Sequence, residues 1–156
     1  MFNYVHHVNH LVYDLPSVEA FFKKHFGLEP IAREEGVAPL PNTMSYQVGP
    51  TILRFVEPTH QHSKEFADLW KAGGPVISHI GLAVENIDKK AKELKEAGVD
   101  FTQPEPIVSP HGGYKVIDIA PEGSYGAKIR SGMWKLNKIL PENHFGIRFQ
   151  LCENIK

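Results

Sequence analysis

One strand-and-helix unit is written twice in the sequence, 72 positions apart, and this repeat most constrains the fold. In the second copy, residues 77–85 alternate between apolar and other side chains, as in a strand with one buried face. After Asn86, which is suited to cap a helix, the apolar side chains fall on one helical stripe. The first copy has His7 in the place of His79 and Asp14 in the place of Asn86. Such a match indicates a duplicated module.

Each copy continues into further short strands, so both modules are predicted to run β-α-β-β-β. The first is expected to hold a strand at 5–13, a helix at 16–25 and strands at 28–35, 43–48 and 51–56, and the second a helix at 87–97 and strands at 77–85, 114–119 and 127–131. Together they predict an α+β fold. The expected boundaries are 1–58 for the first module, 59–75 for a linker, 76–132 for the second module and 133–156 for a C-terminal extension.

Within that extension, residues 145–151 alternate like one more strand, which we expect to form a sheet edge or a subunit contact outside the repeat.

Composition limits the class of protein. The 156 residues are 42% apolar and 22% charged, as in an ordinary soluble domain. The formal charge of −1 argues against partners such as nucleic acid or an anionic membrane. A single cysteine, Cys152, excludes an intramolecular disulfide and favours a reducing cytoplasm. We find no signal peptide or apolar run long enough to span a membrane, so the predicted location is cytoplasmic.

The duplicated β-α-β-β-β unit, opening each time with a histidine seven residues before Asp or Asn, resembles the vicinal oxygen chelate superfamily. That group includes glyoxalase I, methylmalonyl-CoA epimerase, extradiol dioxygenases and bleomycin-resistance proteins. The resemblance implies that two modules pair their curled sheets into one open barrel. It also implies a divalent metal, held by the first-strand His and the last-strand carboxylate or Gln of each module.

Carried onto this chain, the resemblance makes His7 and His79 the two imidazole positions. It puts Arg54 and Arg130 where the two carboxylates belong, and arginine cannot ligate a metal. The leading expectation is therefore a site without a cofactor. The alternative is a divalent Zn, Ni, Co or Fe ion on His7 and His79, with carboxylates from elsewhere such as Glu57 or Glu85.

A site changed in this way would be cationic. The strand alternation predicts a cavity lined by His7, Asn9, Arg54, His79, Lys128 and Arg130, in which the arginines grip a carboxylate or phosphate. In the competing interpretation each arginine pairs with a nearby carboxylate, such as Glu34, Glu35 or Glu85, and only holds the sheets in register.

The other histidines have simpler interpretations. His6 and His10 are expected on the helix-facing side of the first strand, and His60 and His62 in a polar linker. His111, followed by two glycines, is compatible with a loop over the barrel mouth.

Two functions remain open. One is a glyoxalase- or epimerase-like lyase or isomerase acting on a small anionic carbonyl compound, with His7, His79 or Glu35 as the base and Arg54 and Arg130 stabilising the enediolate. The other is a protein of the bleomycin-resistance type, which sequesters an anionic or aromatic ligand without chemistry. In either case the C-terminal extension makes a homodimer an expectation.

Overall fold

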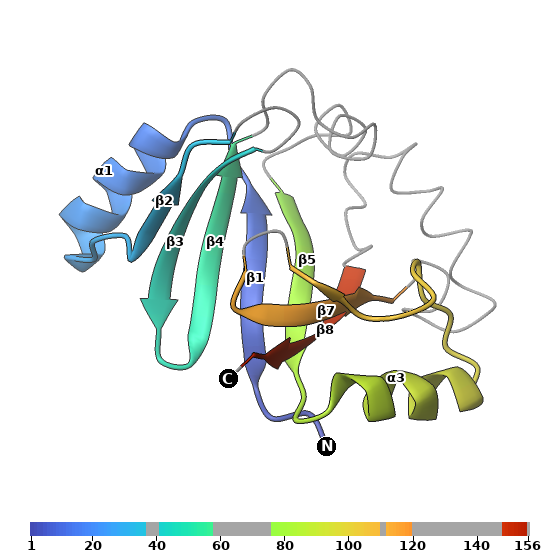
Figure 1. Cartoon of the computed structure of the whole chain (residues 1–156). Coiled ribbons are helices and arrows are strands. Elements are labelled where there is room, and N and C mark those ends of the chain that lie inside the picture. The colour runs from blue at the N-terminus through green and yellow to red at the C-terminus, as the bar shows by residue number, and fades with distance from the viewer. Residues whose placement is uncertain (37–40, 58–75, 110–111, 120–147, 156) are drawn as a thin grey trace.

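The computed structural model describes residues 1–36, 41–57, 76–109, 112–119 and 148–155 (Figure 1). Two helices lie within this part of the chain, α1 (Leu15–Phe26) and α3 (Ile87–Glu96). Its strands are β1 (Val5–Leu11), β2 (Ala32–Glu34), β3 (Asn42–Val48), β4 (Thr51–Glu57), β5 (Val76–Ala83), β6 (Ile107–Val108), β7 (Tyr114–Asp118) and β8 (Arg148–Asn154).

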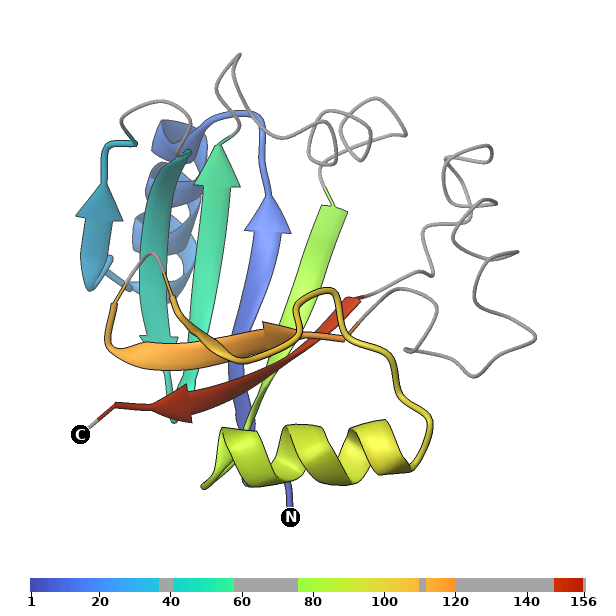
Figure 2. The same cartoon turned by 45° about the vertical axis from the view of Figure 1, so that its right-hand side comes forward.

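These strands form one mixed, eight-stranded sheet in the order β2-β3-β4-β1-β5-β8-β7-β6. The sheet curls, so that β7 and β8 cross in front of the first-module strands on the side away from α1 (Figure 2). The predicted α+β class, with two β-α-β-β-β modules paired into one open, curled barrel, is confirmed.

The two modules have the same internal pairing. β1 runs parallel to β4 and β4 antiparallel to β3, while β5 runs parallel to β8 and β8 antiparallel to β7. Antiparallel pairing of β1 with β5 joins the two halves at the centre of the sheet. The opening strands that the repeat identified are therefore neighbours, which brings His7 close to His79.

The C-terminal segment requires a correction. The expectation that it lies outside the repeat is wrong, because β8 is the parallel partner of β5 and so the fourth strand of the second module. Leu151 and Cys152 in β8 are completely buried. Residues 127–131, predicted to be that strand, lie outside the described residues, and the exact module boundaries stay predictions.

Both helices begin at the predicted caps and cover the convex face of the sheet. The Asp14 carboxylate accepts a 2.7 Å hydrogen bond from the Ser17 amide, and the Asn86 side chain accepts one of 2.8 Å from the Lys89 amide. The apolar core lies between helices and sheet, with α1 packed on Met44, Tyr46 and Phe55 and α3 on Ile117 and Leu151. Polar side chains are left for the opposite, concave face.

Candidate functional site

A row of polar side chains crosses the concave face from β3 to β5. The strand register pairs Ser45 with Arg54, Arg54 with Asn9, and Asn9 with His79. Ser45, Asn9 and Arg54 are buried, and His79 is partly exposed. Adjacent strands lie about 4.8 Å apart, so Arg54 and His79 flank Asn9 with their Cα atoms roughly 10 Å from each other.

His7 lies next to this row and contacts His79 directly. The Nε2 atoms of the two rings are 3.0 Å apart, and His7 is only 1% exposed. The Nδ1 atom of His79 is 3.2 Å from the hydroxyl of Ser78. A nitrogen pair at this distance must share one proton, because two lone pairs or two N–H groups would repel.

Arg54 is a buried cation, 6% exposed, with neutral partners among the described residues. Its Nη1 donates a 2.8 Å hydrogen bond to the Tyr114 hydroxyl, and its Nε donates one of 3.4 Å to the Ser45 hydroxyl. No described carboxylate forms an ion pair with it. The competing interpretation, in which Arg54 pairs with Glu34, Glu35 or Glu85, is therefore wrong for the described structure.

Asn9 contributes an unsatisfied acceptor between Arg54 and His79. Its Oδ1 atom is buried and has no hydrogen-bond partner in the part of the chain that the structure describes. Burying such an oxygen without a donor costs about 1–3 kcal/mol, which is a common mark of a ligand position.

His6 lies in the site, and its predicted place on the helix-facing side is wrong. The β1–β5 register shifts between Val5 and His7, so a bulge re-aims His6 onto the concave face. Its Nδ1 lies 2.9 Å from Nδ1 of His7, and its ring packs 4.7 Å from that of Tyr114. Burial lowers the pKa of His6, more than its hydrogen bond to Asn154 raises it, and Arg54 lowers it further.

Comparisons with known proteins give the same fold. Residues 6–117 match the family described as the glyoxalase/bleomycin resistance protein/dioxygenase superfamily. The chain belongs to this superfamily. No curated protein matches the chain.

Solved structures with low sequence identity to this chain have the same fold. A hypothetical protein, BH1468 from Bacillus halodurans C-125, matches with a TM-score of 0.75 and 20% identity over 98% of this chain and 95% of that one. Streptomyces coelicolor methylmalonyl-CoA epimerase in complex with 2-nitronate-propionyl-CoA matches with a TM-score of 0.74 and 15% identity over 100% of both chains. The Mycobacterium tuberculosis methylmalonyl-CoA epimerase matches with a TM-score of 0.74 and 16% identity over 99% of this chain and 90% of that one. At these identities the likeness shows the fold alone.

With β8 as the last strand, the resemblance implies Gln150 and not Arg130 as the second-module ligand position, which the sequence alone did not indicate. Gln150 pairs with Gly81 as Arg54 pairs with Asn9, so Gln150 and Arg54 hold equivalent places. Its Nε2 donates a 2.8 Å hydrogen bond to Asp118. Arg130 was assigned this place because β8 was not recognised as the last strand of the module.

The four residues that the resemblance implies as ligands do not all fit a metal site. His7, His79 and Gln150 offer three neutral donor atoms, but the fourth position holds the guanidinium of Arg54, which cannot ligate and repels a cation. A different group of potential ligands exists beside it. One ligand atom each from His6, His7 and Cys152 lies within 4.8 Å of the others, and all three residues are buried.

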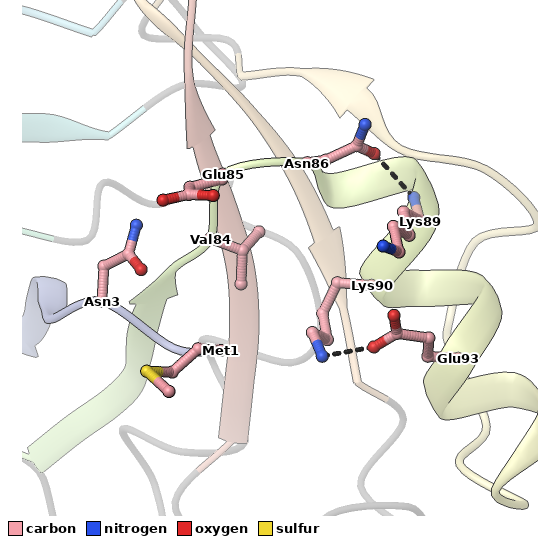
Figure 3. Close-up of a pocket in the computed structure, with 8 residues that line it drawn as sticks. All are labelled: Met1, Asn3, Val84, Glu85, Asn86, Lys89, Lys90 and Glu93. Atoms are coloured by element: carbon pink, nitrogen blue, oxygen red, sulfur yellow. Dashed lines mark hydrogen bonds and ion pairs between the residues drawn. The ribbon is translucent and has the colours of Figure 1, made fainter.

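The carboxylates considered for the alternative metal site lie elsewhere. Glu57 contacts Asn42 at the end of the β3–β4 pair. Glu85 lines a pocket of about 210 Å³ at the start of α3, together with Asn86, Lys89 and others (Figure 3). Glu85 lies six positions after His79, beyond the end of β5, which corresponds to about 20 Å of extended chain. Neither carboxylate has a described contact with His7 or His79.

The remaining predicted site residues are scattered or not described. Glu35 is exposed beyond edge strand β2, whereas the preceding Glu34 accepts a 3.1 Å hydrogen bond from Thr43 on the concave face. His10 packs against Phe55, on the helix-facing side as predicted. The predicted residues outside the described part of the chain are His60, His62, His111, Lys128 and Arg130.

Proposed function

We propose that the chain is a glyoxalase- or epimerase-like lyase or isomerase acting on a small anionic carbonyl compound, without a metal at the superfamily's position. The observation that carries the proposal is the environment of Arg54. A buried guanidinium whose hydrogen-bond partners among the described residues are hydroxyl groups is costly unless a counter-charge arrives, and a bound carboxylate or enolate would supply it. No helix of the described residues is long and apolar enough to cross a membrane.

The row across the sheet suggests how the reaction would proceed. Arg54 holds the carbonyl or carboxylate oxygen, and its charge stabilises the enediolate as it forms. His79, the partly exposed member of the His7–His79 pair, accepts the proton from the neighbouring carbon at Nδ1, in the tautomer in which its Nε2 donates to Nε2 of His7 and the Ser78 hydroxyl donates to the Asn9 carbonyl. The Oδ1 atom of Asn9, for which the described residues offer no donor, accepts a hydrogen bond from a substrate hydroxyl or enol. Of the two glutamates near β2, Glu34 is the better second candidate for a base, because its carboxylate reaches the concave face.

Proton exchange in D₂O tests this proposal. We expect the chain to exchange the α-proton of methylmalonyl-CoA, the substrate class suggested by the epimerase likeness, or of a small 2-oxo carboxylate. Arg54→Met should weaken ligand binding by tenfold or more, and His79→Gln should stop exchange while binding persists. Binding that is unchanged in Arg54→Met would overturn the anion site.

The same experiment distinguishes the alternative function. A sequestering protein of the bleomycin-resistance type needs Arg54 and a cleft but no base. Such a protein would bind an anionic or aromatic ligand in the wild type and in His79→Gln equally, with no exchange in either. As part of the proposal we retain the predicted homodimer and cytoplasmic location, the former measurable by light scattering.

A further inference from the structure

A second cluster of ligand-type side chains lies on the Nδ1 edge of His7, away from His79. Nδ1 of His7 is 2.9 Å from Nδ1 of His6 and 3.9 Å from Sγ of Cys152. His6, His7 and Cys152 are 4%, 1% and 0% exposed. Around a zinc ion, with N and S ligands at about 2.1 and 2.3 Å, tetrahedral geometry separates two nitrogens by roughly 3.4 Å and a nitrogen from a sulfur by roughly 3.6 Å. The observed spacings are close to these values.

Two local features of the backbone bring the three side chains together. The β1 bulge lets adjacent residues, His6 and His7, present their rings on the same face of the sheet. Gly81, opposite His7 on β5, leaves the space that the cluster fills. A Cβ atom at this glycine would lie 2.6 Å from Cε1 of His7 and 2.9 Å from Sγ of Cys152.

The hydrogen bonds around His6 direct its Nδ1 lone pair into the cluster. The Asn154 amide nitrogen lies 3.1 Å from the Tyr4 hydroxyl, so its Oδ1 faces Nε2 of His6 at 2.9 Å. An oxygen acceptor there requires an N–H on Nε2, which leaves Nδ1 of a neutral His6 as an acceptor. Metal-binding histidines are held in this way, with the second ring nitrogen donating to a carbonyl oxygen.

His7 is held in the matching orientation. If its Nε2 donates to Nε2 of His79, then Nδ1 of His79 donates to the Ser78 hydroxyl, which in turn donates to the Asn9 carbonyl. Each hydrogen bond from His7 through His79 and Ser78 to Asn9 then has one donor and one acceptor with both imidazoles neutral, and Nδ1 of His7 carries a lone pair. In this tautomer the Nδ1 lone pairs of His6 and His7, 2.9 Å apart, are both available to one cation, and in the opposite tautomer Nδ1 of His7 carries a proton and donates to Nδ1 of His6.

We propose that His6 Nδ1, His7 Nδ1 and Cys152 Sγ bind one thiophilic transition-metal ion of the zinc and copper class. Two imidazoles and a thiolate select such ions over Mg²⁺ or Ca²⁺. The Oε1 atom of Gln150, 3.6 Å from Sγ, is the available fourth ligand. Binding displaces the thiol proton of Cys152.

The proposed ion differs from the superfamily's metal in place and in two of its ligands, because it shares the residues His7 and Gln150 but binds the opposite nitrogen of His7. The superfamily metal lies on the side of His7 that faces His79, and its ligand set includes neither His6 nor Cys152. The proposal does not depend on the proposed enzymatic function. A variant at His79 therefore separates the two sites.

Titration of the metal-free full chain with Co²⁺ tests the site, because a thiolate ligand gives Co²⁺ an intense near-ultraviolet charge-transfer band. We expect one equivalent per chain with this band in the wild type and in His79→Gln. Cys152→Ser should abolish the band, His6→Gln should weaken binding at least tenfold, and Asn154→Ala about tenfold. Zn²⁺ should compete with Co²⁺ and raise the melting temperature of the wild type but not of Cys152→Ser.

Other outcomes would overturn the proposal. Co²⁺ binding without the thiolate band would indicate other ligands, such as surface histidines. Loss of binding in His79→Gln with retention in Cys152→Ser would place the ion at the superfamily's position instead. Circular dichroism of each variant establishes that it is folded, and His6→Gln gives an independent test if Cys152→Ser does not fold.

Discussion

Nη1 of Arg54 in β4 lies 2.8 Å from the hydroxyl of Tyr114 in β7, so one hydrogen bond spans the interior of the curled sheet. The guanidinium carbon also lies 6.0 Å from the centre of the Tyr114 ring. The two strands belong to different modules and are not neighbours in the sheet. This contact therefore couples closure of the barrel to the placement of the proposed anion-binding group.

Tyr114→Phe should destabilise the fold by about 1.5–3 kcal/mol, because it removes a hydrogen bond made by a buried charged group. Urea unfolding measures the change. Tyr46→Phe is the matched control, since Tyr46 is also buried but its hydroxyl donates, within the described part of the chain, to the thioether of Met44, a weak acceptor. We expect it to cost less than about 1 kcal/mol. Equal losses in the two variants would argue against the cross-barrel bond.

A second prediction concerns the place of β8 in the fold. Leu151 is fully buried against α3 residues and Ile117, so Leu151→Ala should cost about 2–5 kcal/mol. Ile155, just beyond the strand, is 47% exposed, and Ile155→Ala should change stability by about 0.5 kcal/mol or less. If residues 148–154 were a detachable extension, both variants would unfold at the same urea concentration as the wild type.

Most of the fold could be predicted from the sequence, because the spacing of apolar residues and the helix-capping residues depend only on neighbouring positions in the chain. The repeat of His7 and His79 identified the two opening strands, and Asp14 and Asn86 cap their helices as predicted. The repeat does not extend at constant spacing to the last strands. Leu53 to Glu57 corresponds to Phe149 to Glu153, but these segments are further apart than His7 and His79. A search that allowed an insertion before the last strand could have found Gln150.

Within the site, alternation predicted correctly that His7, Asn9, Arg54 and His79 share a face. It failed for His6, because a β-bulge is decided by pairing with β5 and leaves no mark on the period of β1. Cys152 was missed for a related reason, since its approach to His7 depends on Gly81 in a third strand. Such convergence of side chains depends on register between strands, which one sequence does not display.

The third prediction is a dependence of stability on pH through His10. Burial against Phe55 lowers the pKa of His10 below its ordinary 6.5. As pH falls below about 6.5, the unfolded chain binds a proton that folded His10 still rejects, so stability decreases until the folded pKa is reached. His10→Gln should reduce this decrease, measured by urea unfolding at intervals from pH 8 to pH 5. Identical pH slopes in the variant and the wild type would contradict the prediction, and stabilities between pH 8 and 9 provide the reference.

The last prediction concerns Gly81, whose role is to leave space and not to permit an unusual backbone. Its φ angle is not positive, so alanine is compatible with the backbone, but a Cβ atom would lie 2.7 Å from Nδ1 of His7 and 2.9 Å from Sγ of Cys152. Gly81→Ala should therefore cost about 1–3 kcal/mol through overpacking, measured by urea unfolding. It should also weaken Co²⁺ binding by spreading the ligand atoms.

A double-mutant cycle with His7→Ala separates this steric effect from a general weakness of β5. Removing the His7 ring empties the space that the alanine methyl would enter, so the cost of Gly81→Ala should fall in that background, with a coupling energy of about 0.5–3 kcal/mol. Additive losses would mean that the Gly81 position tolerates a methyl group without meeting His7. In that case the close approach of His7 and Cys152, on which the proposed metal site depends, would not exist in solution.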